Sequence, residues 1–267
     1  MHFLFDIGGS SMRLASSRDD QNLLNLEILP TPQIFEEGIS LLIQAAQRIT
    51  NGEKIESIAG GIAGPLDSQH TMMVKSGNLA DWAQKPIKKH LEQVFNTTVF
   101  LENDAGLGGL GEATYGAGKG FKIVTYLTIS TGVGGSRIVN GKIDQNTLGF
   151  EPGHQIISLD ETILQDYISG KALYKRNNIK PEQITDPKVW DEVARLLAIG
   201  LNNTIVHWSP EVVVLGGSVM KSIDIEKVRS YLDKILEVFV QKPEIKRAEL
   251  EEKAGLYGGL AYLKSLS

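Results

Sequence analysis

Two glycine-rich segments with hydroxyl side chains are the first candidates for chemistry in this sequence. Asp6-Ile7-Gly8-Gly9-Ser10 and Ser130-Thr131-Gly132-Val133-Gly134-Gly135 each follow a run of strand-forming residues. Such loops offer backbone N–H and hydroxyl groups to phosphate oxygens without side-chain bulk in the way. Asp6 ends the first strand, where a carboxylate can hold Mg²⁺ through the waters of the ion. The alternative, that Asp6 and Ser10 form only turn hydrogen bonds, is weaker for two such loops than for one.

Glu102-Asn103-Asp104 lies where another predicted strand ends and a helix begins. Asp104 could accept the proton of a substrate hydroxyl as general base, while Asn103 orients that substrate. Asn and Asp are also favoured helix N-caps, and the local sequence alone favours capping. Because only one of the two residues need cap the helix, the two roles can coexist.

Glu151-Pro152-Gly153-His154 places a carboxylate and an imidazole on a constrained loop. Both side chains can hydrogen-bond, so the pair suits recognition of sugar hydroxyls. A single histidine is more often structural than functional, and this interpretation therefore depends on the neighbouring Glu151.

Two other glycine motifs are rejected as sites. The segment 106–111 satisfies G-x-G-x-x-G, but the next strand does not end in the acidic residue that a dinucleotide site needs. We predict that its glycines let a helix pack tightly. The segment 116–120 resembles part of a P-loop but lacks both the preceding strand and the Ser or Thr after its lysine.

The elements that must position these residues alternate along the chain. Residues 3–15 read as strand, glycine turn and strand, and residues 123–139 repeat that order. The match of Ile7-Gly8-Gly9-Ser10 with Val133-Gly134-Gly135-Ser136 suggests a duplication, with two similar sheets in two lobes that face one cleft. The remaining pattern predicts an α/β chain, with strands at 24–29, 55–62, 99–101 and 212–215 and helices over 35–49, 86–95, 105–115, 187–208, 224–239 and 255–266.

The composition limits the class of protein. The 267 residues include 27 basic and 32 acidic side chains, a net charge of −5, so no basic field is available for nucleic acid. No apolar run approaches the ~20 residues of a membrane span, and the N-terminus lacks the pattern of a signal peptide. We therefore expect a cytoplasmic protein with no membrane or nucleic-acid partner. Cysteine is absent, which excludes disulfides and zinc sites built on thiolates.

Taken together, these residues resemble the ROK family (repressors, uncharacterised open reading frames and sugar kinases) of the actin-like ATPase superfamily. The likeness runs nearly from end to end, and it also includes Ala63-Gly64-Pro65-Leu66-Asp67, Gly77-Asn78-Leu79 with Trp82, Asn140-Gly141-Lys142, Tyr167-Ile168-Ser169-Gly170 and Val214-Leu215-Gly216-Gly217-Ser218-Val219. The resemblance implies an α/β, duplicated actin-like ATPase (ribonuclease H-like) fold of two lobes with a central cleft. It places residues 1–103 and about 250–267 in a smaller N-terminal lobe, and 104–249 in a larger C-terminal lobe.

The same resemblance implies ATP-dependent phosphorylation of a hexose or N-acetylhexosamine hydroxyl, the 6-OH, with Asp104 as general base. Mg²⁺ would accompany the nucleotide near Asp6, and the protein would form a homodimer. The residues implied to bind the sugar are Gly64, Asn78, Asn103, Glu151, His154 and Gln165. Those implied to bind the nucleotide are Asp6, Gly8, Gly9, Ser10, Thr131, Gly132, Gly134, Gly216 and Gly217.

Three departures from the family pattern stand out. The family usually has a cysteine cluster after the Glu-Pro-Gly-His loop that holds zinc together with the histidine, whereas this chain has no cysteine. We therefore expect no zinc, and His154 must be oriented in another way. A glutamate that often contacts the sugar is Gln165 here, which leaves the preferred sugar open. The lysine common after the first glycine loop is Ser11, and Arg13 on the same strand face could substitute for it.

Three alternatives to an ATP-dependent kinase remain. Short zinc-free relatives include polyphosphate glucokinases, but no basic run in this sequence requires a polymeric anion, so ATP is preferred. Sugar-sensing regulators of the family carry a DNA-binding helix-turn-helix before the first phosphate loop, whereas five residues precede Asp6. A degenerate sugar-binding protein is conceivable from Gln165 and the missing zinc motif. The retention of Asp104 and both phosphate loops favours an active enzyme.

Overall fold

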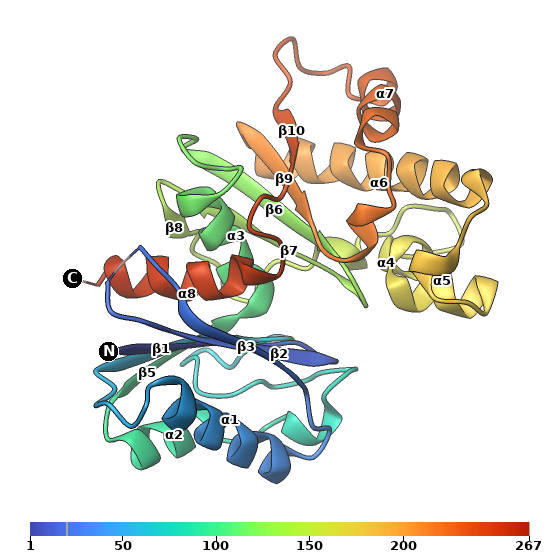
Figure 1. Ribbon diagram of the computed structural model, residues 1–267. Helices are drawn as coiled ribbons and strands as arrows, with labels where there is room; N and C mark the ends of the chain where they lie inside the picture. The colour runs from blue at the N-terminus through green and yellow to red at the C-terminus, as the bar shows by residue number, and fades with distance from the viewer. Residues whose placement is uncertain (20, 267) are drawn as a thin grey trace.

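Two five-stranded sheets form the framework of the structure, a computed structural model that describes residues 1–19 and 21–266 (Figure 1). The first sheet has the order β3-β2-β1-β4-β5 and the second the order β10-β9-β6-β7-β8. The strands of the first are β1 (His2–Ile7), β2 (Ser11–Ser17), β3 (Leu24–Pro30), β4 (Ser57–Ile62) and β5 (Thr98–Asn103). Those of the second are β6 (Ile123–Ile129), β7 (Val133–Val139), β8 (Lys142–Ile143), β9 (Val212–Gly216) and β10 (Glu244–Arg247).

The two sheets repeat one pattern of connections. In the first sheet β1 pairs antiparallel with β2 and parallel with β4, and in the second β6 pairs antiparallel with β7 and parallel with β9. The outer strands continue the same pattern, since β3 and β8 are antiparallel to their neighbours and β5 and β10 are parallel. The predicted duplicated α/β fold is therefore confirmed.

The register of the duplication is not the one suggested by the sequence match. β7 begins at Val133, so Gly134 and Gly135 lie inside the ladder between β6 and β7 and not in the turn. The turn that corresponds to residues 8–10 is therefore 130–132. Glycine is needed within β7 because a Cβ on Gly135 would collide with the short 3₁₀ segment that packs over this strand.

Helices cover both faces of the first sheet. α1 (Phe35–Ile49) and α2 (Ile87–Phe95) lie on one face, and α8 (Ala254–Lys264) lies on the other (Figure 1). Alternate residues of β1 supply both cores, because successive side chains of a strand point to opposite faces. Phe3 and Phe5 pack with α1, and Leu4 packs with α8.

The second sheet is covered on one face by α6 (Pro187–Trp208), with α4 (Gln165–Ile168), α5 (Gly170–Asn177) and α7 (Ile225–Ile235), and on the other by α3 (Asp104–Tyr115). α6 has the predicted bounds because Asp186 caps its first turn and Pro210 follows its end. α7 ends earlier than predicted, at Ile235, and β10 was not predicted at all. Short 3₁₀ segments span Ala80–Trp82, Pro152–His154, Pro181–Gln183, Val219–Lys221 and Glu251–Lys253.

α3 and α8 lie against each other between the two sheets (Figure 1). A Cβ on Gly111 of α3 would lie 2.2 Å from the carbonyl oxygen of Ala254, and one on Gly258 of α8 would lie 1.8 Å from that of Leu107. The two helices therefore meet backbone to backbone, and the glycines after Gly106 serve helix packing as predicted. Within the described residues, no helix combines the length and apolarity needed to cross a membrane.

Candidate active site

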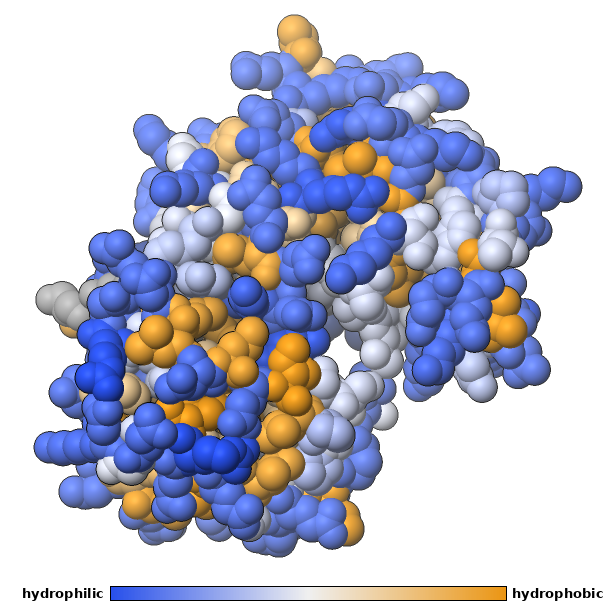
Figure 2. All heavy atoms as spheres, in the orientation of Figure 1, coloured by the Kyte–Doolittle hydropathy of each residue, from blue (hydrophilic) through white to orange (hydrophobic). Residues whose placement is uncertain are grey.

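A cleft of about 1620 Å³ separates the two sheets, and Figure 2 shows the hollow between the two lobes on one face. Residues of both sheets line it. All sixteen residues singled out in the sequence for the sugar, the nucleotide or catalysis are among them: Asp6, Gly8, Gly9, Ser10, Gly64, Asn78, Asn103, Asp104, Thr131, Gly132, Gly134, Glu151, His154, Gln165, Gly216 and Gly217. The structure thus brings the predicted residues together, and their individual roles remain predictions.

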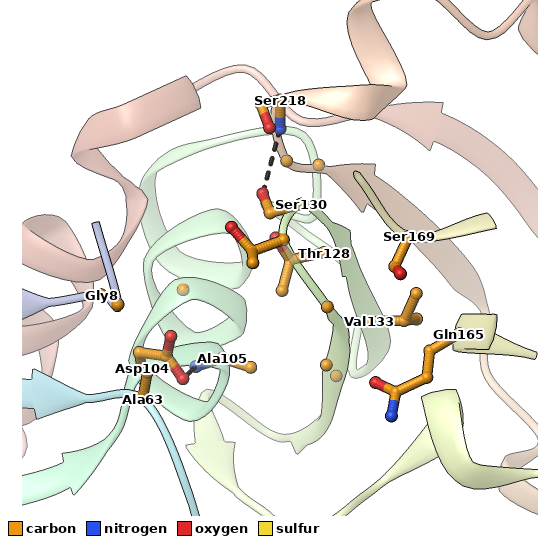
Figure 3. A pocket seen from close by; sticks show the side chains of 18 of the residues that line it. Gly8, Ala63, Asp104, Ala105, Thr128, Ser130, Val133, Gln165, Ser169 and Ser218 are labelled. Atoms are coloured by element: carbon orange, nitrogen blue, oxygen red, sulfur yellow. Dashed lines mark hydrogen bonds between the residues drawn. The ribbon is translucent and has the colours of Figure 1, made fainter. Parts of the chain in front are cut away.

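Asn103 and Asp104 divide two tasks between them. The Asn103 side chain caps α3, since its oxygen accepts a hydrogen bond from the Gly106 N–H at 3.1 Å. Its amide nitrogen donates to the carbonyl oxygen of Gly64 at 3.1 Å, which ties the end of β5 to the loop after β4. Asp104 accepts one bond from the Ala105 N–H at 2.9 Å and faces the cleft (Figure 3). Capping by Asn103 therefore leaves the Asp104 carboxyl available for proton transfer.

The backbone at position 64 requires a glycine. Its φ of +130° is a backbone conformation that L-residues with side chains rarely adopt. A Cβ there would also lie 2.7 Å from the carbonyl oxygen of Lys75. The glycine lets two loops of the first lobe run side by side at the mouth of the cleft, with the Gly64 carbonyl directed at Asn103.

Burial raises the pKa of two aspartates that line the cleft, Asp6 and Asp104. The pKa of Asp6 rises to about 7, through burial first and then through the charge of Asp104, against a lowering effect of Arg13. The pKa of Asp104 rises to about 6, mainly through burial, while the Ala105 N–H lowers it, the charge of Glu151 raises it and Arg13 again lowers it. A carboxyl whose pKa lies near neutrality is suited to general acid–base catalysis.

Glu151, His154 and Gln165 form a connected group on the opposite side of the cleft. His154 Nδ1 lies 3.4 Å from Glu151 Oε2, and His154 Nε2 lies 3.3 Å from Gln165 Nε2. Both neighbours thus restrain the imidazole, which answers how His154 is oriented in a chain without cysteine. The loop is fixed beneath them, because Gly153 packs so closely on β7 that a Cβ would lie 2.3 Å from the Val133 carbonyl oxygen.

The glycine loops of the second lobe are tied to one another by backbone contacts. The Ser218 N–H donates to Ser130 Oγ at 3.1 Å, which joins the turn after β6 to the turn after β9 (Figure 3). At the same time the Gly170 N–H at the start of α5 donates to the Ser130 carbonyl oxygen at 2.7 Å. Gly217 has a φ of +94°, and a Cβ on it would lie 2.3 Å from the Ile129 carbonyl oxygen. Close contact of backbones therefore shapes this part of the cleft.

Sequence reasoning missed several polar residues that line the cleft. Ser130 and Ser218 were part of the glycine motifs but received no role of their own. Lys171 and Lys175 face the cleft from α5, and Lys221 from the segment after β9. The i, i+4 spacing of the first two lysines was readable as one helix face. Only the structure shows that this face is turned towards the phosphate loops.

The class of protein follows from this arrangement. Two sheets of one connectivity, each with a glycine turn directed into the same cleft, define the duplicated actin-like ATPase fold.

Comparison with known proteins gives the family. The model of the ROK family matches residues 4–265, and the chain belongs to this family. A glucokinase of Thermotoga maritima is 26% identical, over 97% of this chain and 96% of its own. The crystal structure of a ROK hexokinase from Thermus thermophilus aligns with a TM-score of 0.86 and 29% identity, over 99% of this chain and 98% of that one. A ROK family glucokinase from Streptomyces griseus, in complex with glucose and AMPPNP, aligns with a TM-score of 0.85 and 25% identity, over 100% and 99%. The protein is accordingly an enzyme, a sugar kinase that transfers a phosphoryl group to an alcohol.

Proposed function

We propose that the protein transfers the γ-phosphoryl group of ATP to the 6-hydroxyl of a hexose or N-acetylhexosamine, with Asp104 as general base. The observation that carries the proposal is the position of Asp104. Its carboxyl, with a pKa of about 6, faces a cleft that is lined both by the glycine loops and by the group of Glu151, His154 and Gln165. The sugar kinases named among its relatives support the class of acceptor.

The proposed reaction is an in-line transfer. The hydroxyl oxygen of the sugar forms a bond to the γ-phosphorus while the bond from that phosphorus to the bridging oxygen of ADP breaks, and the hydroxyl proton passes to Asp104. The backbone N–H groups of residues 9–10 and 131–132, with the hydroxyls of Ser10 and Thr131, would stabilise the oxygens of the phosphoryl group. The N–H groups of Gly8 and Ser130 donate within their own turns, to the carbonyl oxygens of Ser11 and Gly132. Proton transfer to a positioned base contributes about 10²–10⁴ in rate.

The carboxylate of Asp6 fits a magnesium ion that would arrive with the nucleotide. Mg²⁺ prefers oxygen ligands, keeps several waters and is commonly bound through one or two carboxylates together with substrate phosphates. Asp6 supplies such a carboxylate at the edge of the cleft beside Gly8. When bound, the ion would neutralise charge on the phosphate oxygens. Arg13 lies 3.8 Å from Asp6 and supplies a second, permanent positive charge.

Sugar recognition is assigned to polar groups that converge from both lobes. His154 and Glu151 can hydrogen-bond sugar hydroxyls from one side, and Asn78 and Asn103 from the other. Asn78 also packs over the first phosphate loop, since a Cβ on Gly9 would lie 2.7 Å from the Asn78 Cβ. Because the polar groups come from both lobes, a bound sugar would draw the lobes together and exclude water as a competing acceptor.

The test is a coupled assay of ADP release over a panel of hexoses and N-acetylhexosamines, with the wild type and Asp104→Asn. We expect turnover that depends on the sugar and falls by about 10²–10⁴ in the variant. Product analysis by NMR would identify the phosphorylated hydroxyl. Equal activity of the variant would contradict the role of Asp104 as general base. Absence of ADP release by the wild type with every sugar would favour a degenerate sugar-binding protein.

Polyphosphate is a second candidate donor, favoured by Lys171, Lys175 and Lys221 in the cleft. These cations come from two separate elements, which explains why the sequence shows no basic run. The same sugar panel with polyphosphate in place of ATP separates the two donors.

A homodimer is proposed from the family resemblance, and sedimentation analysis tests it.

A further inference from the structure

Glu112 is a buried carboxylate outside the reaction described above. It lies on α3, one residue after the glycine at which α3 meets α8, and its side chain has no exposed surface. Its two oxygens accept three backbone hydrogen bonds. Oε2 accepts from the Ala117 N–H at 2.9 Å and the Glu249 N–H at 3.2 Å, and Oε1 accepts from the Leu250 N–H at 2.8 Å.

This arrangement must compensate for a substantial cost. A buried charge is unfavourable unless it is paired or fully hydrogen-bonded. No ion pair that includes Glu112 occurs in the part of the chain that the structure describes, so the backbone N–H groups take the place of a counter-ion. Gly116 makes the approach possible, since a Cβ on it would lie 2.2 Å from Glu112 Oε2. A leucine at this position would fill the space but would leave the N–H groups of residues 117, 249 and 250 without their acceptor, which indicates that the carboxylate serves to hold these donors.

The bonds of Glu112 join segments that are far apart in the chain. Residues 117, 249 and 250 belong to the loop after α3 and to the link between β10 and α8. α3 leads from the first sheet to the second, and this link leads back from the second sheet to the helix that covers the first (Figure 1). Glu112 therefore fixes the return connection onto the outgoing one.

The segment held by Glu112 forms part of the cleft on the side of the Gly216 loop. Residues 248, 251 and 252 line it. The Ala248 N–H donates to the Leu215 carbonyl oxygen at 2.9 Å, and Glu251 pairs with Lys221 at 3.7 Å. The residues that flank this loop thus take their position from a segment that is anchored from behind by one buried side chain.

We propose that Glu112 is a positioning residue for the nucleotide: it holds residues 248–252 in the place where they form one wall of the nucleotide side of the cleft. The proposal rests on the proposed function in taking the Gly216 side as the nucleotide side. Glu112 touches neither substrate nor the reacting atoms, so its effect should fall on nucleotide binding and spare sugar binding.

The test is Glu112→Gln, with Glu249→Gln as the matched control. Glutamine keeps the shape and one acceptor oxygen but turns an N–H₂ group towards backbone N–H groups, so at least one of the three bonds is lost. The control removes an exposed carboxylate of the same segment and leaves its backbone bonds in place. For Glu112→Gln we expect the KM for ATP to rise about tenfold, equivalent to about 1.4 kcal/mol, with the KM for the sugar changed less than twofold. Hydrogen exchange of the amides at 249 and 250 should accelerate in this variant and not in the control.

A lower thermal midpoint with both KM values unchanged would overturn the proposal, and so would equal increases in both. If Glu112→Gln does not fold, Leu250→Pro removes one donor and keeps the carboxylate. Leu250 has a φ of −84°, near the range of proline, and the same division between the two KM values is expected. A wild type without turnover on any sugar would contradict the proposed function instead. Calorimetric titration with Mg·ATP would then still compare the affinities of the wild type and the variant.

Discussion

Asp6 and Arg13 face each other across the first hairpin: they are direct partners in the ladder between β1 and β2, and Arg13 Nη1 lies 3.8 Å from Asp6 Oδ2. Arg13 lowers the pKa of both Asp6 and Asp104 against the effect of their burial. Its Nε is buried and has no hydrogen-bond partner among the residues that the structure describes, while the cavity reaches the side chain. We therefore infer that Arg13 provides the positive charge beside the first phosphate loop, since Ser11 carries none.

Replacing Arg13 with methionine should impair the reaction in a pH-dependent way. Without the guanidinium the pKa of Asp104 rises above its value of about 6, so less of the base is ionised at neutral pH. We expect kcat/KM to fall about 10²-fold at pH 7, with the acid limb of its pH profile moved to higher pH. Arg13→Lys retains the charge and should keep the limb near its original position. An unmoved limb in the methionine variant would argue against this role.

Asp104→Asn should stabilise the fold while it lowers turnover by about 10²–10⁴. The pKa of Asp104 is about 6 in the folded protein, against a model value of 3.8. The folded state therefore binds more proton than the unfolded state between these values, and its stability falls as the pH rises through that window. At pH 8 the wild type bears this cost in full and the neutral variant does not. We expect the thermal midpoint of the variant to exceed that of the wild type by about 6–12 °C at pH 8 and to converge with it at pH 4, as calorimetry would show.

Gln165→Ala should weaken sugar binding selectively. The variant removes one of the two side chains that restrain His154, whose Nε2 lies 3.3 Å from the Gln165 amide. We expect the KM for the sugar to rise about tenfold, which is the effect of one lost hydrogen bond of about 1.4 kcal/mol, with the KM for ATP nearly unchanged. Steady-state kinetics with each substrate varied in turn provides the measurement. A larger effect on the KM for ATP would place Gln165 on the nucleotide side instead.

Gly258→Ala should destabilise the protein more than Gly259→Ala, although the two residues are neighbours on α8. A Cβ at Gly258 would lie 1.8 Å from a backbone oxygen of α3, whereas one at Gly259 would first meet the flexible end of Leu4 at 3.3 Å. We expect a loss of about 1–3 kcal/mol for the first variant and little change or a slight gain for the second, since alanine favours helix. Urea denaturation compares them directly. Equal stabilities would show that α3 and α8 separate easily.

Hydrophobic periodicity and turn residues predicted the helices, strands and turns that have a strong local signal in the sequence. The turn at Asn140-Gly141 adopts the expected left-handed backbone at both residues, with φ of +51° and +72°. β10 was not predicted because only Ile245 of its four residues is buried, so its sequence lacks the alternation of apolar and polar residues that indicates a strand. Its position depends on parallel pairing with β9, which is a long-range contact. The division of the chain into lobes at residue 103 and near 250 stays a prediction.

The candidate site was predicted where short motifs carry its chemistry and missed where distant segments meet. Asp104 and His154 lie within short recognisable motifs, but nothing near Glu112 in the sequence indicates that the backbone N–H groups of residues 249 and 250 bond to it. The tie between Ser130 and Ser218 likewise joins turns that are 88 residues apart. Such contacts follow from the packing of the lobes and have no local signature.

The repeated connectivity of the two sheets also implies a division of labour after gene duplication. Asp6 and Thr128 occupy equivalent places, each one residue before the end of the strand that carries the phosphate turn. The first half has Asp6 at this position and Asp104 directly after β5, whereas the second half has Thr128 at this position and Ala248 directly after β10. A symmetric pair of either half would possess both turns but would carry four acids at these positions or none. The two halves of the chain therefore share one framework but are not interchangeable at these positions.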